Sequence, residues 1–237
     1  MTLANYARSN ASAPLPSARN NLSRYFSPNL VEMLAERDEP LGAVRRQNVA
    51  VLFADIVGFT SMAERMAPEA VVRMLREYHE RMTAPIFACG GTIDKYIGDE
   101  IFAVFGVPDA SAADAPNALK CANMMLAALE CWNEEREAKG EPRLAIGIGL
   151  NYGPAVLGDV GSEHSFSFTV IGDTVNTASR LQRLTRSLET PLVVGDALVD
   201  AVNSGPTDGG AALASELQDR GEQALRGRAG AVRIWTR

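Results

Sequence analysis

Two aspartates occupy positions from which they could hold a divalent cation. Asp55 ends the apolar run VAVLFAD (49–55), and Asp99 follows Gly98 in a predicted turn between two apolar segments. Mg²⁺ prefers oxygen ligands, and carboxylates at the ends of rigid strands can present them. Either aspartate alone would be an ordinary turn or cap residue. Together they predict a metal site, provided that the fold brings them close to each other.

The segments around these aspartates predict alternating strands and helices. Residues 49–55 are apolar almost throughout, which is typical of a strand buried on both faces. We expect a helical stretch over roughly 60–87 and two strands over 91–106 that are joined by a tight turn. Residues 113–138 predict an amphipathic helix.

The second half of the sequence continues this alternation. Residues 143–161 indicate a second hairpin with Gly153-Pro154 at its turn, and residues 173–188 predict a helix with basic residues in its later turns. The glycines of 143–161 match neither GxGxxG after a strand nor a P-loop, so we expect turn and close-packing roles for them. A last strand is expected near AVRIW. Strands that alternate with helices predict an α+β or α/β layer fold.

Length and composition narrow the possible classes of protein. The 237 residues fit one ordinary domain plus an extra segment, which we divide into a flexible leader at 1–20, an N-terminal helical segment and connector at 21–46, and a folded domain at 47–237. The net charge of −6 argues against a nucleic-acid partner. No apolar run reaches the ~18 residues of a membrane span. We therefore expect a cytoplasmic protein whose cysteines are free thiols.

Four segments together resemble the class III adenylyl and guanylyl cyclases. They are FADIVGFTSMAE, DKYIGDEIFAVFG, GIGLNYGPAVLGDVGS and FTVIGDTVNTASRL, and they follow the family's order with family-like spacing. The resemblance covers roughly residues 45–237. It implies an α+β fold with a ferredoxin-like βαββαβ core, whose mixed or antiparallel sheet is flanked by helices. It also implies conversion of ATP into cyclic AMP and pyrophosphate.

The resemblance implies roles for individual residues as well. Asp55 and Asp99, with the backbone carbonyl of Ile56, match the family's ligands for two divalent cations, Mg²⁺ or Mn²⁺. Two such cations can clamp the attacking and leaving oxygens of an in-line displacement. Asn176 and Arg180 match the pair that acts on the transition state. Their spacing of four places both on one helix face, although by spacing alone a surface polar pair is the simpler interpretation.

Three further positions concern the nucleotide. Lys95 and Thr169 match the residues that contact the base, and their ammonium and hydroxyl groups can satisfy adenine N1 and the exocyclic amine. Guanine presents the reverse pattern of donors and acceptors, so we expect ATP as the substrate. Arg228, in the short motif LRGRAG, resembles the basic residue that reaches the triphosphate. The threonine variant also resembles a subgroup often stimulated by bicarbonate, which we keep as a hypothesis.

Assembly is a further implication of the resemblance. Class III domains pair head to tail, with the metal-binding acids from one chain and the asparagine–arginine pair from the other. This sequence has all of these elements, so it predicts a symmetric homodimer with shared active sites. Two alternatives stay open: a guanylyl cyclase, and a catalytically silent homologue that serves as a nucleotide-binding or dimerisation module.

Overall fold

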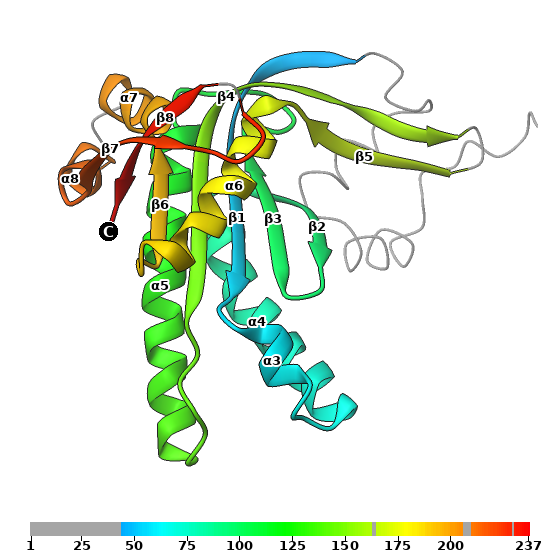
Figure 1. Cartoon of the computed structure of the whole chain (residues 1–237). Helices are drawn as coiled ribbons and strands as arrows, with labels where there is room; N and C mark the ends of the chain where they lie inside the picture. Colours follow the sequence, from blue (N-terminus) through cyan, green and yellow to red (C-terminus); the bar gives the residue numbers. More distant parts are fainter. Residues whose placement is uncertain (1–43, 163–164, 206–209, 229) are drawn as a thin grey trace, which may run out of the picture.

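A mixed sheet forms the centre of the computed structural model, which describes residues 44–162, 165–205, 210–228 and 230–237 (Figure 1). The strands lie in the order β2-β3-β1-β4-β6-β8-β7, and β5 pairs with β4 outside this path. The predicted leader at 1–20 and nearly all of the helical segment and connector at 21–46 lie outside the described residues. Strand β1 (Arg45–Ile56) begins two residues before the boundary predicted at residue 47.

The first half of the described chain forms the expected ferredoxin-like core. Strand β1 is antiparallel to both of its neighbours, β3 and β4, and β2 is antiparallel to β3. The helices α4 and α5 complete the order βαββαβ, which confirms the predicted α+β fold class. The elements of this half are β1, α3 (Phe59–Ala63), α4 (Pro68–Ala88), β2 (Thr92–Ile97), β3 (Glu100–Phe105), α5 (Asp114–Ala138) and β4 (Ile146–Ser162).

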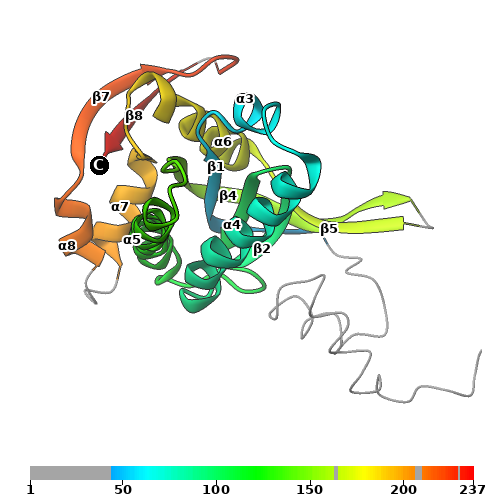
Figure 2. The same cartoon turned by 90° about the horizontal axis from the view of Figure 1, so that it is seen from below.

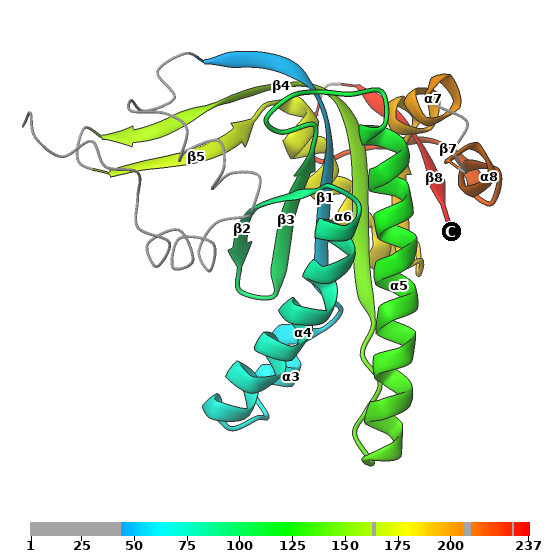
Figure 3. The same ribbon diagram turned by 180° about the vertical axis from the view of Figure 1, so that it is seen from behind.

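Helices cover both faces of the sheet. Figures 1 and 3 show, from opposite sides, that α4 and α5 lie on one face and α6 (Asp173–Ser187) on the other. Alternate residues of β1 therefore enter two different hydrophobic clusters. Leu52 and Ile56 pack with residues of α4 and α5, whereas Val51 and Phe53 belong to the cluster that contains Ala178 of α6. This two-sided burial explains the continuous apolar run at 49–55.

Strand β4 runs through the position where the sequence predicts a hairpin turn. Gly153 and Pro154 both pair with β1 in the middle of this strand, so the predicted turn is wrong. Gly153 serves close packing instead, because a Cβ there would lie 2.9 Å from Oγ1 of Thr174 at the start of α6. The far part of β4 pairs with β5 (Ser165–Ile171), and this two-stranded ribbon extends beyond the rest of the sheet (Figures 1 and 2).

The C-terminal part widens the sheet on the side away from β2. It comprises β6 (Leu192–Gly195), α7 (Asp196–Ser204), α8 (Gly210–Ser215), β7 (Gln218–Ala224) and β8 (Ala231–Thr236). Strand β7 is not predicted by the sequence, because its residues QDRGEQA are polar. It lies at the edge of the sheet and pairs only with β8. Among the described residues, no helix has the length and apolar character needed to cross a membrane.

Candidate active site

The two aspartates singled out in the sequence come together at the end of β1. Asp55 is the penultimate residue of this strand and is 8% exposed. Asp99 lies in the tight turn between β2 and β3, which Gly98 makes possible with a φ of 65°. The carboxylate of Asp99 reaches across and accepts a hydrogen bond from the backbone N–H of Ile56, with 3.0 Å between N and Oδ2. Asp55, Ile56 and Asp99 therefore form one cluster.

Both oxygens of Asp55 are engaged by side chains of α6. The Nε2 of Gln182 donates to Oδ1 at 2.6 Å, and a guanidinium nitrogen of Arg186 donates to Oδ2 at 2.5 Å. Burial raises the pKa of Asp55, Arg186 lowers it, and the negative charge of Asp99 raises it again. Neither Gln182 nor Arg186 is predicted from the sequence, because nothing local links them to an aspartate that is more than a hundred residues away.

The oxygen atoms of this cluster are suitable ligands for a hard divalent cation. The cluster offers two carboxylates, and Mg²⁺ is commonly bound by one or two carboxylates while phosphates and water complete its coordination. Within the described ranges, no cluster of three or more acidic, histidine or cysteine side chains could bind a metal by itself. Such a cation would compete with Arg186 for the same oxygen of Asp55.

A second cluster joins β2 to β5. The Nζ of Lys95 donates to Oγ1 of Thr169 at 3.1 Å, so the structure places the two predicted base-contacting residues side by side. Both also contact Asp94, which is not among the residues predicted from the sequence. The carboxylate of Asp94 lies 3.0 Å from the Lys95 ammonium and accepts hydrogen bonds from the Thr169 hydroxyl at 3.2 Å and from the Val170 N–H at 3.1 Å.

Asp94 is the buried member of this cluster. Its side chain is 2% exposed, whereas that of Lys95 is 41% exposed. Burial raises the pKa of Asp94, and the ammonium of Lys95 with the hydrogen bonds from Val170 and Thr169 counteracts this by stabilising the carboxylate. The cluster thus has a buried carboxylate, that of Asp94, and an accessible ammonium group, that of Lys95.

The remaining predicted residues lie along the first half of α6 and beside it. Asn176 is exposed, and Arg180 donates to the carbonyl of Gly227 at 3.3 Å. Arg228 donates to Oγ1 of Thr177 at 2.9 Å and forms an ion pair with Asp173 at 3.2 Å. Arg180 and Arg228 are therefore both held where the loop between β7 and β8 meets α6.

The two ends of α6 serve different groups of residues. Gln182 and Arg186 touch Asp55, and Asn176 lies six and ten residues earlier in the same helix. At 1.5 Å per residue, these separations amount to about 9 and 15 Å along the helix axis. One copy of the chain thus brings Asp55, Ile56 and Asp99 together, and separately Lys95 and Thr169, but it does not bring Asn176 to the aspartates.

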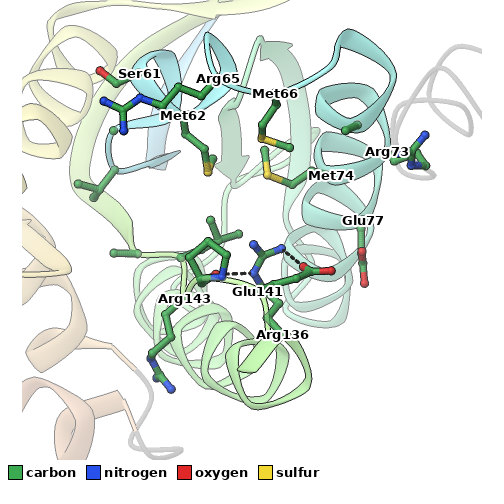
Figure 4. A pocket seen from close by; sticks show the side chains of 16 residues that line it. Ser61, Met62, Arg65, Met66, Arg73, Met74, Glu77, Arg136, Glu141 and Arg143 are labelled. Carbon is green, nitrogen blue, oxygen red and sulfur yellow. Dashed lines mark hydrogen bonds and ion pairs between the residues drawn. The ribbon is translucent and has the colours of Figure 1, made fainter. Parts of the chain in front are cut away.

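A cavity of about 840 Å³ lies elsewhere, between α3, α4 and the loop that follows α5. Figure 4 shows that Met62, Met66 and Met74 line it, opposite the ion pair between Arg136 and Glu141. None of the residues predicted to act on the nucleotide lines this cavity. Its lining begins at Val57, directly after Ile56, but it includes no residue of the two clusters described above.

Comparison with known proteins identifies the class to which this fold and these clusters belong. Residues 41–236 match the family described as the adenylate and guanylate cyclase catalytic domain. The chain therefore belongs to this family, and the resemblance stated from the four sequence segments is confirmed.

Particular relatives include both kinds of cyclase. An adenylate cyclase of Anabaena cylindrica is 40% identical over 192 residues, which are 78% of this chain and 37% of that protein. The structure of the adenylyl cyclase CyaB from P. aeruginosa is 27% identical, has a TM-score of 0.71, and covers 82% of this chain and 95% of that chain. The guanylyl cyclase Cya2 is 31% identical with a TM-score of 0.69, over 81% of this chain and 92% of that chain. The chain spans well under half the length of the first curated relatives that it matches.

Proposed function

We propose that this chain is an adenylyl cyclase, which converts ATP into 3′,5′-cyclic AMP and pyrophosphate. The ribose 3′-hydroxyl would attack the α-phosphorus in line with the departing pyrophosphate. The main support is the convergence of Asp55 and Asp99 at the end of β1. Phosphoryl transfer depends mostly on positioning and on neutralising charge. Two adjacent carboxylates at a rigid strand end would position the divalent cations that neutralise the charge of the phosphates.

Asp55, Asp99 and the carbonyl of Ile56 would hold two divalent cations against the phosphates. When bound, these cations would lower the pKa of the 3′-hydroxyl and offset the charge of the phosphates. Asp99 would be kept in place by the N–H of Ile56, and Asp55 by Gln182. Arg186 would have to share or release its oxygen of Asp55.

The base would bind at the Lys95–Thr169 cluster. A Lys95 N–H would donate to adenine N1, and the Thr169 oxygen would accept from the exocyclic amine. The position of Lys95, 3.1 Å from Thr169 and partly exposed, is compatible with both contacts. A guanine base would meet a donor with a donor and an acceptor with an acceptor, and each such mismatch costs about 1–3 kcal/mol.

We propose further that each active site is shared between two chains in a head-to-tail homodimer. Asn176, Arg180 and Arg228 would act on the nucleotide whose cations the partner subunit holds. The separation of Asn176 from Asp55 along α6 favours this arrangement. Exposed apolar side chains on β2 and β5 also favour it, because such groups beside a site often mark an interface; they are Tyr96 (46% exposed), Ile97 (55%) and Ile171 (49%).

The decisive experiment mixes two inactive variants, Asp55→Ala and Arg180→Ala. Each should lose nearly all cyclic AMP production when alone. Random exchange of subunits should then restore roughly a quarter of wild-type activity, because half of the dimers would have one intact site out of two. Mixing Asp55→Ala with Asp99→Ala is the control and should restore nothing, because both changes fall on the same side of the shared site. No recovery despite demonstrated exchange would contradict the shared site.

Parallel assays with ATP and GTP, in Mg²⁺ and in Mn²⁺, separate this function from the two alternatives. A guanylyl cyclase would prefer GTP, and a silent homologue would bind nucleotide without forming a cyclic product. Stimulation by bicarbonate is a separate prediction, and activity that does not change with added bicarbonate at fixed pH would remove it. A cytoplasmic location also remains a prediction.

A further inference from the structure

We propose that Asp94 determines the choice of base by fixing the direction of the Thr169 hydroxyl, so that Thr169 can only accept a hydrogen bond from the nucleotide. This inference rests on the proposed function, because it assumes that Lys95 and Thr169 meet the base. It adds a residue that acts through Thr169 and does not itself touch the nucleotide.

The threonine hydroxyl has a single proton. A hydroxyl donates one hydrogen bond and can accept two. Thr169 could therefore offer a base either a donor, which suits guanine O6, or an acceptor, which suits the adenine amine. A threonine in this position does not select between the two bases by itself.

The neighbours of Thr169 remove this freedom. The ammonium of Lys95 can only donate, so its 3.1 Å contact uses one lone pair of Oγ1. The carboxylate of Asp94 can only accept, so its 3.2 Å contact takes the hydroxyl proton. One lone pair remains, and it can serve only as an acceptor. A base at this position must therefore present a donor, as adenine does with its amine.

The geometry around Asp94 makes this arrangement hard to reverse. Its Oδ1 accepts from the Val170 N–H, and its Oδ2 faces both Thr169 and the Lys95 ammonium. The side chain is 2% exposed, so water does not compete for these oxygens. The Lys95 ammonium uses two of its three N–H groups in the contacts with Asp94 and Thr169. The third N–H can donate to an acceptor such as adenine N1.

The test is the substitution Asp94→Asn, which keeps the size of the side chain. The Val170 N–H still requires the asparagine oxygen, so the amide NH₂ takes the place of Oδ2, where it donates to Thr169 and no longer accepts from the Lys95 ammonium. The hydroxyl proton is then released toward the base. We expect the ratio of kcat/KM for ATP to that for inosine triphosphate to fall by about tenfold or more, since one buried mismatch is relieved for one base and created for the other. Inosine has the O6 and N1–H of guanine without its 2-amino group.

Two controls separate this effect from simple damage. Asp109→Asn removes the same charge at a side chain that is 85% exposed, and it should leave the ratio unchanged. Loss of structure would lower turnover of both nucleotides together and would show in the circular dichroism spectrum. Thr169→Val should by itself lower the ratio, because the acceptor is lost, and adding Asp94→Asn to it should lower the ratio little further.

The outcomes distinguish this inference from the proposed function. Suppose that the wild-type chain forms cyclic AMP. If Asp94→Asn then leaves the ratio unchanged, or lowers it as much in the Thr169→Val background as in the wild type, the inference is wrong and the proposed function stands. If Asp94→Asn does not fold, an unchanged ratio in Thr169→Val overturns the inference. If the wild-type chain forms no cyclic product, the proposed function fails. Binding of 3′-deoxy-ATP and 3′-deoxyinosine triphosphate, which cannot cyclise, then measures the same preference by calorimetry.

Discussion

At the scale of single residues, the site depends on two hydrogen bonds that side chains of α6 donate to Asp55. Gln182 is 1% exposed and neutral, so it can hold one carboxylate oxygen without competing for its charge. Arg186 has a side chain that is 54% exposed, and it neutralises the other oxygen. The first contact orients the carboxylate. The second occupies the place that a cation would take.

Removing the charge of Arg186 should therefore strengthen binding of divalent cations. We expect Arg186→Gln to tighten binding of Mn²⁺ to the nucleotide-free protein by about two- to fivefold, because a partly exposed ion pair contributes only about 0.2–1 kcal/mol. Isothermal titration calorimetry with Mn²⁺ alone measures this without reference to activity. The matched control is Arg183→Gln, which removes the same charge from an exposed position of the same helix. Equal tightening in both variants would mean that general charge, and not the contact with Asp55, is responsible.

The sequence predicts part of the candidate site at this scale. The proximity of Asp55 to Asp99 and of Lys95 to Thr169 is expected from four recognisable segments. In the structure, Asp99 accepts from the N–H of Ile56, which follows Asp55, and Lys95 donates to Thr169. Asp94 and the two α6 residues could not be predicted in the same way. Each is defined by a contact with a residue 75 to 131 positions away, and local patterns contain no information on such pairs.

At the scale of elements, β4 and α6 can approach each other because β4 lacks side chains at their contact. A Cβ at Gly149 would lie 2.2 Å from the backbone nitrogen of Gln182 and 2.5 Å from the carbonyl of Ala178. A Cβ at Gly147 would lie 2.2 Å from Oγ1 of Thr185. These glycines therefore have the close-packing role predicted for them. They allow α6 to lie close enough to the sheet for its side chains to reach Asp55.

Substitution at this contact should destabilise the domain. We expect Gly149→Ala to lower the free energy of unfolding by about 1–3 kcal/mol, because the added methyl group meets backbone that cannot move aside without shifting α6. The midpoint of urea denaturation measures the loss. Gly158→Ala in the same strand is the control, since its Cβ would find its nearest neighbour at 3.7 Å, in the side chain of Val44. A similar loss in both variants would show that strand propensity, and not packing against α6, is the cause.

The elements themselves could be predicted where periodicity is strong and not where it is weak. The helices α4, α5 and α6 lie within one or two residues of the expected ranges, apart from the break that separates α3. The turn expected at Gly153-Pro154 failed because a glycine and a proline are typical of turns, whereas here tertiary packing against Thr174 requires the glycine. The polar strand β7 has no apolar alternation, since it is an edge strand.

At the scale of the whole molecule, the reactivity of the three cysteine thiols measures how well the packing of the domain excludes reagents from its core. Cys89 and Cys121 are buried where α4 and α5 meet, and Cys131 is exposed. The neighbouring thiol of Cys121 lowers the pKa of Cys89, which favours the thiolate form. Its surface is 6% exposed, however, and burial should keep reagents away from it.

Accessibility and not acidity should therefore govern the reaction of these thiols. We expect Ellman's reagent to modify one thiol quickly at neutral pH in the native protein, and all three only in denaturant. Cys131→Ser should abolish the fast phase. A second fast thiol in the native protein would show instead that α4 and α5 separate readily.

Helix α6 also has a mechanical consequence for the proposed dimer. Its 15 residues form one rod whose C-terminal half contacts Asp55 and whose first turn holds Asn176, with Arg180 at the middle. In a two-fold assembly, each rod would touch both catalytic centres, one at either tip. A stiff body cannot move at one tip alone, so filling the first centre should alter affinity at the second. Substrate saturation curves should then deviate from a simple hyperbola, in a direction set by whether the rod moves toward or away from the empty centre.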